Sequence, residues 1–182
     1  MQLRDASVKF YTRFATNEDA PHFAAIERSA CKRFRTIADL AWIADEEPTA
    51  IEEHFTLISA GTVWIAEDGL GKISGFLLAE RCGEELHICE FAVESPRQGQ
   101  GIGTLLLQTA IAYARAMGLK ALTLTTFREL SWNEPFYHHS GFETLAASDL
   151  NERLVAAFAR EVLIGLPIGR RCAMRLVLSR LR

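Results

Sequence analysis

The sequence predicts an α/β domain built on a mixed sheet, and three observations support this fold class. The chain has 182 residues, enough for one domain with a full-sized core. Residues 62–94 hold three successive apolar stretches of strand length, separated by short turns. Residues 101–117 place apolar side chains at helical spacing, and residues 120–126 return to strand-like alternation. A run of strands followed by a helix, a strand and a further helix is typical of an α/β architecture.

The N-terminal region predicts one strand and two helices. Residues 11–15 have strand character. Thr16 supplies a capping oxygen and acidic residues follow it, which is typical of a helix start. Pro21 falls where the beginning of a helix tolerates it, and a second helix is expected over residues 49–59. The apolar face of the first helix is expected to consist of Phe23, Ile26 and Ala30.

The central strands are expected over residues 62–67, 72–80 and 85–94. Pro96 cannot continue the third of them as a central strand, and Gly118 is expected to stop the following helix. The later elements are expected to be a strand over residues 120–126, a short helix over 134–140, a strand starting within 142–145, a helix over 150–163 and a closing strand over 172–179.

Composition and charge exclude several classes of function. The net charge is -3, and the sequence shows no clustered basic face, so no nucleic-acid partner is expected. Residues 1–10 are polar and lack the apolar core of a signal peptide. No uncharged apolar run reaches about 18 residues, so no membrane span is expected either. A short basic tail is interpreted as the solvated side of a terminal strand: Arg170, Arg171, Arg175, Arg180 and Arg182.

The four cysteines are scattered singly along the chain. Neither their spacing nor that of the histidines matches a zinc pattern, so no metal is expected. Isolated cysteines are typical of reduced residues in a cytoplasmic protein, and we therefore expect a cytoplasmic location.

The most informative segment is residues 93–105, where a strand ends, glycines alternate and a helix begins. Glycine lets the backbone approach a ligand closely and adopt positive φ. The first N–H groups of a helix have no partner within it, and together with the helix dipole they form an anion site. A pyrophosphate is therefore expected to bind the amides of residues 98–104.

Two other phosphate motifs do not fit this segment. A dinucleotide fold requires Gly-x-Gly-x-x-Gly, but the third position is Thr104 when counted from Gly99 and Leu106 when counted from Gly101. The acid expected at the end of the next strand is also absent, and so is the Gly-Lys-Ser/Thr of a P-loop. A glycine-rich turn without a ligand is the remaining alternative. Three glycines at a helix start cost stability, which favours a functional reason for them.

The pattern Gln98-x-x-Gly101-x-Gly103 resembles the CoA loop of the GCN5-related N-acetyltransferase (GNAT) family, whose pattern is Gln/Arg-x-x-Gly-x-Gly/Ala. The preceding strand ends with Phe-Ala-Val at residues 91–93, similar to the fourth strand of that family. The resemblance extends to both sides of the loop. Residues 133–142 resemble the family's Asn…Tyr-x-x-x-Gly-Phe block, and residues 14–20 resemble its first strand and helix. Residues 125–133 resemble the corresponding segment of a bacterial subgroup of the family.

The resemblance implies a single N-acetyltransferase domain over residues 1–182, with its core at about 11–178. It implies a mixed, mostly antiparallel sheet of six to seven strands flanked by helices, with acetyl-CoA as co-substrate and an amine as acceptor. Whether the protein forms a homodimer stays open. The implied cofactor contacts are the backbone of Phe91 and Val93 along the pantetheine arm, Asn133 near that arm, and the phosphate loop with Gln98, Gly99, Gln100, Gly101, Gly103 and Thr104.

Acetyl transfer from a thioester requires stabilisation of the departing thiolate. Tyr137 lies four residues before Gly141, the position of the family's acid, and the resemblance implies this role for it. A phenol is a weaker acid than a thiol, so Tyr137 is expected to donate a strong hydrogen bond or to protonate the sulfur as the C–S bond breaks. The alternative is a packed aromatic residue, a role that the neighbouring Phe136 fits better.

The amine must also lose a proton before it attacks. Some family members carry a His or Glu at the position of His87, and histidine titrates in the useful range. The alternatives are that His87 is a hydrogen-bonded core residue, that Glu90 is the base if a bulge shifts the strand face, that Glu85 is the base, or that bulk water takes the proton.

Direct transfer is expected, because nothing near Cys89 in the sequence pairs with it as a His pairs with a nucleophilic cysteine. A small-molecule primary amine is favoured over a protein tail, and an acyl group larger than acetyl stays open. A CoA-binding regulatory module without turnover and a non-enzymatic interaction protein are the other classes considered. The acceptor wall is expected to include Phe34, Arg35, Trp42, Asp45, Glu46 and Glu47.

Overall fold

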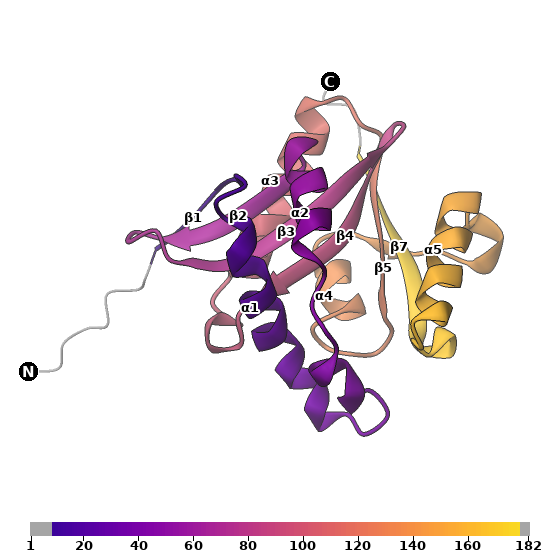
Figure 1. The fold of residues 1–182 in the computed structure, drawn as a ribbon. Helices are drawn as coiled ribbons and strands as arrows, with labels where there is room; N and C mark the ends of the chain where they lie inside the picture. The colour runs from indigo at the N-terminus through magenta and orange to yellow at the C-terminus, as the bar shows by residue number, and fades with distance from the viewer. Residues whose placement is uncertain (1–8, 179–182) are drawn as a thin grey trace, which may run out of the picture. The chain divides into compact units, whose positions relative to one another are not determined.

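The computed structural model describes residues 9–178, and in that range seven strands form one mixed sheet in the order β1-β2-β3-β4-β5-β7-β6 (Figure 1). β4 and β5 run parallel, whereas the pairs β1–β2, β2–β3, β5–β7 and β6–β7 are antiparallel. The strands are β1 (Phe10–Phe14), β2 (Val63–Asp68), β3 (Ile73–Cys82), β4 (Glu85–Val93), β5 (Ala121–Phe127), β6 (Glu143–Thr144) and β7 (Arg171–Val177).

The α-helices lie close to their predicted positions, within about two residues at most ends. Two short 3-10 helices, Lys32–Thr36 and Ala41–Asp45, lie in a stretch where no helix is predicted from the sequence. The α-helices are α1 (Ala20–Cys31), α2 (Ile51–Ser59), α3 (Ile102–Ala116), α4 (Glu134–His139) and α5 (Glu152–Leu163). No helix within residues 9–178 is both long and apolar enough to cross a membrane.

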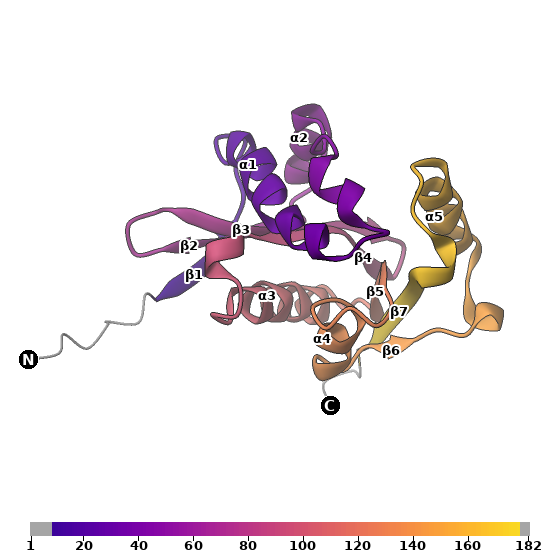
Figure 2. The same cartoon turned by 90° about the horizontal axis from the view of Figure 1, so that it is seen from below.

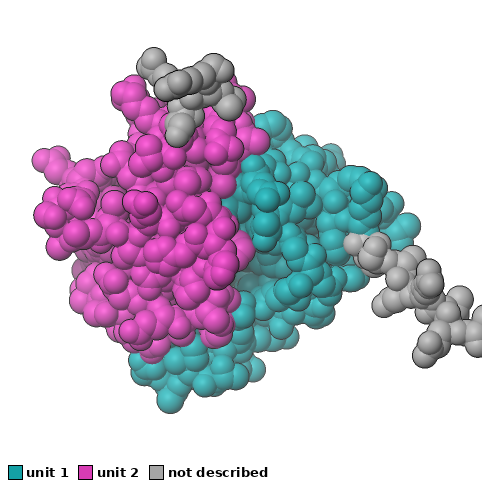
Figure 3. All heavy atoms as spheres, turned by 180° about the vertical axis from the view of Figure 1, so that it is seen from behind, with its two compact units in different colours: residues 1–79, 90–110 teal, residues 80–89, 111–182 magenta. Residues whose placement is uncertain are grey.

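The chain divides into two compact units, coloured separately in Figure 3. Unit 1 consists of Met1–Ala79 and Glu90–Ala110, and unit 2 consists of Glu80–Cys89 and Ile111–Arg182. β3, β4 and α3 therefore contribute residues to both units.

In unit 1, α1 and α2 cover one face of the strands and the start of α3 covers the other (Figure 2). The core on the α1 face forms because alternate residues of each strand point to it. On the α3 face, the hydroxyl groups of Thr12 in β1 and Thr109 in α3 lie 2.9 Å apart. The α1-side core contains Phe23, Ile26, Val63, Ile65, Phe76, Leu78 and Ala92.

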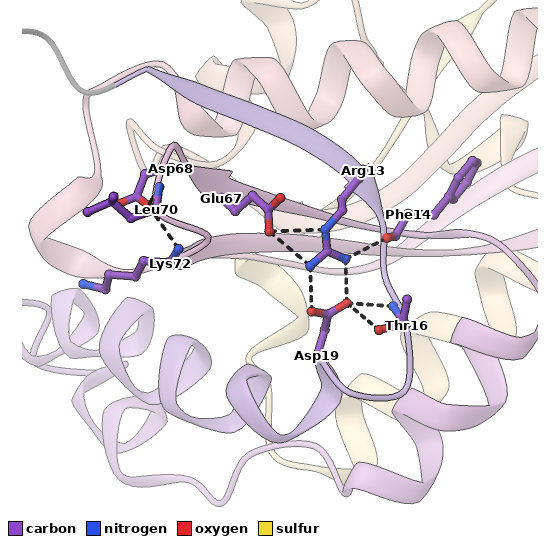
Figure 4. Close-up of polar contacts among 8 residues, drawn as sticks. All are labelled: Arg13, Phe14, Thr16, Asp19, Glu67, Asp68, Leu70 and Lys72. Carbon is purple, nitrogen blue, oxygen red and sulfur yellow. Dashed lines mark hydrogen bonds and ion pairs between the residues drawn. The ribbon is translucent and has the colours of Figure 1, made fainter.

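The start of α1 differs from the prediction, and Figure 4 shows the contacts that hold it. α1 begins at Ala20, so Thr16 is not its cap and no acidic side chain lies in its first turn. Instead, the Asp19 carboxylate accepts hydrogen bonds from the Thr16 N–H at 2.7 Å and from Arg13 Nη1 at 2.8 Å. Arg13 also donates to Glu67 of β2 through Nε at 3.2 Å. This one guanidinium thus joins two strands to the helix start.

In unit 2, ion pairs connect α5 to the strands. Arg153 of α5 donates to Glu85 of β4 at 2.7 Å, and Arg171 of β7 donates to Glu161 of α5 at 2.6 Å. The expectation that Arg171 lies on a solvated face is wrong, because its side chain is only 9% exposed. The Arg175 side chain is 40% exposed and pairs with Glu85. Residues 1–8 and 179–182 lie outside the described residues, and the latter include Arg180 and Arg182 of the predicted tail.

Candidate active site

The segment between β4 and α3 has the backbone of an anion-binding loop. After β4 ends at Val93, Gly99 and Gly101 have φ values of 75° and 83°, in the left-handed region that favours glycine. A Cβ built on either glycine would meet no atom within 4 Å, so there is open space beside the loop. The glycines are thus needed for backbone conformation, and their open side leaves room for a ligand.

The first turn of α3 presents unpaired backbone donors. The Leu105 N–H donates to the Gly101 carbonyl at 2.9 Å, which is the first hydrogen bond of the helix. The N–H groups of Ile102, Gly103 and Thr104 precede this bond and therefore have no acceptor within α3. α3 has 15 residues, so the positive end of a long helix dipole adds to these donors. Such a terminus suits a phosphate group.

Two glutamine side chains brace the loop. Gln98 Nε2 donates to the Val93 carbonyl at 2.9 Å, and Gln100 Nε2 donates to the Pro96 carbonyl at 3.1 Å. Both residues were predicted to contact the cofactor. Since their side chains bind the protein backbone, any contact of these residues with a phosphate would come from their backbone amides.

Tyr137 lies on α4 in unit 2 and is 8% exposed. Its ring makes edge contacts with Phe136 and Phe142, at centroid distances of 5.1 and 5.6 Å. Burial raises the pKa of the Tyr137 phenol above its usual value, so the group stays protonated at neutral pH. The buried Tyr137 hydroxyl is therefore better suited to donate a hydrogen bond than to give up its proton completely.

Asn133, just before α4, has an unused acceptor. Its Nδ2 donates to Thr126 Oγ1 at 2.8 Å, which fixes the orientation of the amide. Its Oδ1 is buried and accepts no hydrogen bond from the described residues. A buried acceptor of this kind is rare unless a ligand or water supplies a donor. An amide N–H, such as those of a pantetheine arm, would match it.

His87 differs from the prediction in its titration. Its Nδ1 lies 3.0 Å from Thr123 Oγ1 in unit 2. Burial, together with the positive charges of Arg153 and Arg160, lowers the pKa of His87 to about 4. The expectation that His87 titrates in the useful range near neutrality is therefore wrong, because the sequence does not show that α5 brings two arginines close to it.

A second group of titratable side chains lies in unit 1, and the sequence analysis missed two of its three members. Glu27 of α1, His54 of α2 and Glu90 of β4 meet there, with His54 Nε2 3.4 Å from Glu90 Oε2. Only Glu90 was considered beforehand. The available signal was that Glu27 lies one helical turn after the buried Phe23, on the same face of α1.

Two of the three acidic residues of the predicted acceptor wall pair with arginines. Asp45 Oδ1 lies 2.6 Å from Arg35 Nη2, and Glu47 Oε2 lies 3.5 Å from Arg28 Nη2. All four side chains are more than half exposed, so these pairs add little stability, and they offset the charge of these two carboxylates only. Among the described residues, no group of three or more His, Cys, Asp or Glu side chains is arranged to hold a metal ion.

Sequence comparison matches residues 18–142 to the family described as "Acetyltransferase (GNAT) family", and this match covers more than half of the chain. The chain belongs to this family. Membership in the GNAT family confirms the predicted enzyme class, an acetyl-CoA-dependent N-acetyltransferase. The CoA loop predicted from the glycine pattern lies inside the matched region.

Several solved structures resemble this GNAT chain in fold. The PaiA N-acetyltransferase from Thermoplasma acidophilum, in complex with coenzyme A, has a TM-score of 0.69 at 16% identity, covering 93% of this chain and 99% of that one. The ribosomal-protein-S18-alanine N-acetyltransferase from Escherichia coli has a TM-score of 0.65 at 17% identity, covering 96% of this chain and 97% of that one. The ribosomal-protein-alanine N-acetyltransferase from Brucella melitensis has a TM-score of 0.66 at 21% identity, covering 92% of this chain and 99% of that one. At such identities the likeness concerns the fold, and it confirms the predicted α/β class.

Proposed function

We propose that this GNAT enzyme transfers the acetyl group of acetyl-CoA directly to a primary amine of a small molecule. The observation that carries the proposal is the loop before α3, where Gly99 and Gly101 adopt positive φ and the first helical amides are free of partners in the helix. A pyrophosphate needs several N–H donors from one concave backbone, and this loop supplies them. The unused Oδ1 of Asn133 offers a further contact for the pantetheine arm.

In the proposed reaction, the neutral amine attacks the thioester carbonyl carbon. The C–N bond forms, the C–S bond breaks, and its electron pair goes to the sulfur. Tyr137 is proposed to donate its phenolic hydrogen bond to that sulfur, which is consistent with a phenol whose raised pKa keeps it protonated. A backbone N–H of β4 is proposed to stabilise the developing oxyanion.

The compact packing of residues 32–45 supports a small acceptor. This stretch folds into two 3-10 helices that pack against each other and against α1. Asp45 of this stretch pairs with Arg35, which offsets one of the carboxylates that a basic peptide tail could contact. A protein amino group is the second candidate acceptor, because two of the structurally similar proteins are ribosomal-protein-alanine N-acetyltransferases.

A cytoplasmic location belongs to the same proposal. The four cysteines, Cys31, Cys82, Cys89 and Cys172, form no disulfide within the described part of the chain. Unpaired cysteines are typical of proteins kept in a reducing compartment.

The decisive experiment is an acceptor screen with acetyl-CoA, read out as free thiol release and as the mass of the acetylated product. The screen compares a library of small primary amines with peptides that carry free α-amino termini. Turnover with small amines supports the proposal, and turnover only with peptides selects the second candidate. CoA binding measured by calorimetry without any turnover would identify a binding module instead of an enzyme.

A further inference from the structure

Three polar side chains from three elements of unit 1 meet inside that unit. His54 of α2 is 1% exposed and lies beside the stacked rings of Phe23 and Phe76, at centroid distances of 5.2 and 6.2 Å. Its Nε2 points at Glu90 of β4, 3.4 Å from Oε2. Glu27 of α1 lies next to the same carboxyl group. An apolar pocket thus holds two carboxyl groups and one imidazole.

The hydrogen bonds of this cluster do not balance when both carboxyl groups are ionised. Glu27 Oε2 accepts from the Thr49 N–H at 3.1 Å. Glu90 Oε1 is buried and has no donor, and neither ring nitrogen of His54 forms a hydrogen bond. Buried acceptors without donors are costly, and two adjacent carboxylates repel each other. One proton placed between the two carboxyl groups removes both penalties.

The electrostatics of the surrounding residues agree with such a proton. Burial and the neighbouring charge of Glu90 raise the pKa of Glu27 to about 7. The other groups that face the pair are His54 from α2 and the Cys31 thiol from α1, and the pKa of Cys31 is itself raised to about 11 by burial and by the two carboxyl groups. The charge of His54 lowers the pKa of Glu27, but burial and the charge of Glu90 raise it by more.

We propose that Glu27 and Glu90 share one proton and that this carboxyl pair accepts the proton that the acceptor amine must lose. The inference rests on the proposed function. Glu90 directly precedes Phe91, the residue proposed to line the pantetheine arm, and its side chain is 19% exposed, so a proton can reach the pair from outside.

The proposed step balances in protons and electrons. The doubly ionised pair takes one proton from the substrate ammonium, which gives a neutral amine and a pair that holds one proton. The amine then attacks the thioester, the C–N bond forms, and the C–S electron pair goes to sulfur. The second amine proton leaves as the amide forms, the thiolate takes up one proton, and the pair returns its proton to water. One proton is released for each turnover.

A pair of this kind is better matched to the reaction than His87. A proton acceptor works best when its pKa is near the working pH. The pKa of Glu27 is about 7, whereas that of His87 is about 4. At neutral pH about half of the carboxyl pairs would be doubly ionised and ready to accept a proton.

The first test is a ¹³C NMR titration of the side-chain carboxyl groups in the free enzyme, without substrates. We expect Glu27 to titrate near pH 7 in the wild type and its midpoint to fall by more than one pH unit in Glu90→Gln. A midpoint for Glu27 in the ordinary glutamate range in the wild type would overturn the shared proton. Because no substrate is present, this result does not depend on the proposed acetyl transfer.

The second test compares pH profiles of kcat/KM for the wild type and Glu27→Gln with one amine, so that the ionisation of the amine cancels in their ratio. Glutamine is isosteric and can still accept the Thr49 hydrogen bond. We expect the ratio of wild type to variant to rise roughly tenfold between pH 6 and pH 8, since only the wild type must lose the shared proton. A matched control, Glu53→Gln, removes an exposed carboxylate of α2 and should give a flat ratio. A flat ratio for Glu27→Gln would overturn the catalytic role.

Discussion

The side-chain amide of Gln98 donates a hydrogen bond of 2.9 Å to the carbonyl oxygen of Val93, the last residue of β4. This contact ties the end of the strand to the loop that precedes α3. It holds the loop in one place relative to the strand, because both its donor and its acceptor are fixed. The proposed binding of CoA depends on that arrangement, since the pyrophosphate and the pantetheine arm would contact adjoining parts of one backbone.

We expect Thr104→Glu to weaken CoA binding at least about tenfold, or about 1.4 kcal/mol. Thr104 is exposed in the first turn of α3, where a carboxylate suits the helix dipole but repels a phosphate. Gly101 is a poorer test position, because its φ of 83° strains any side chain. The control is Gln108→Glu, an exposed position one turn further along α3. Calorimetry with CoA measures both variants, and equal affinities would contradict the phosphate site.

We expect Tyr137→Phe to lower kcat by about 10²-fold or less while CoA affinity changes little. The ring and its contacts with Phe136 and Phe142 are kept, and the hydroxyl that is proposed to donate to sulfur is removed. An interaction made mainly in the transition state lowers kcat and kcat/KM together. Tyr113→Phe serves as a control elsewhere in unit 2. Wild-type kcat in Tyr137→Phe, when chemistry limits the rate, would show that Tyr137 only packs.

We expect Cys89→Ala to keep most of the activity, because the proposed transfer forms no acetyl-enzyme. Cys89 is exposed, and its Sγ lies 3.5 Å from the His87 carbonyl oxygen, an acceptor that cannot activate it as a base would. Mass spectrometry after rapid mixing with acetyl-CoA checks the prediction. A transient acetyl group on Cys89 that an added amine removes would refute direct transfer.

We expect Gly75→Ala to destabilise the protein by about 1–3 kcal/mol. A Cβ at Gly75 would lie 2.9 Å from the Ala92 carbonyl oxygen and 3.1 Å from Val93 Cγ2, so the backbone of β4 would have to move. Gly69→Ala is the matched control, since a Cβ there meets nothing within 4 Å. Urea unfolding of both variants gives the difference. Equal free energies of unfolding for the two variants would show that β4 can shift without destabilising the protein.

We expect Glu27→Gln to gain stability relative to the wild type as the pH rises from 5 to 8. The pKa of Glu27 is raised from 4.5 to about 7 in the fold. The folded protein therefore binds more protons than the unfolded chain between these values, so the contribution of this group is complete below about 4.5 and is lost as the pH rises through about 7. Urea unfolding at both pH values measures the change, with Glu53→Gln as the control. A difference that does not vary with pH would show that Glu27 titrates normally.

The order of the elements and the phosphate loop could be predicted because their causes are local. Helical spacing from Ile102 onward and glycines at positions 99 and 101 are visible in a single stretch of chain, and the structure places α3 and the positive φ values there. The start of α1 was misplaced because the capping role of Thr16 was inferred from a motif, whereas the carboxylate of Asp19 is held by Arg13 and by the Thr16 N–H.

What only the tertiary structure decided is how distant residues alter each other's charge. The sequence by itself determined the fold class and the loop that places this chain among acetyltransferases. It could not determine that His87 lies near two arginines of α5, or that Glu27 and Glu90 come together beside His54. A pKa depends on burial and on the charges within a few ångströms. Those neighbours come from other elements of the sheet and its helices, so the proton chemistry of the site is fixed only when the chain folds.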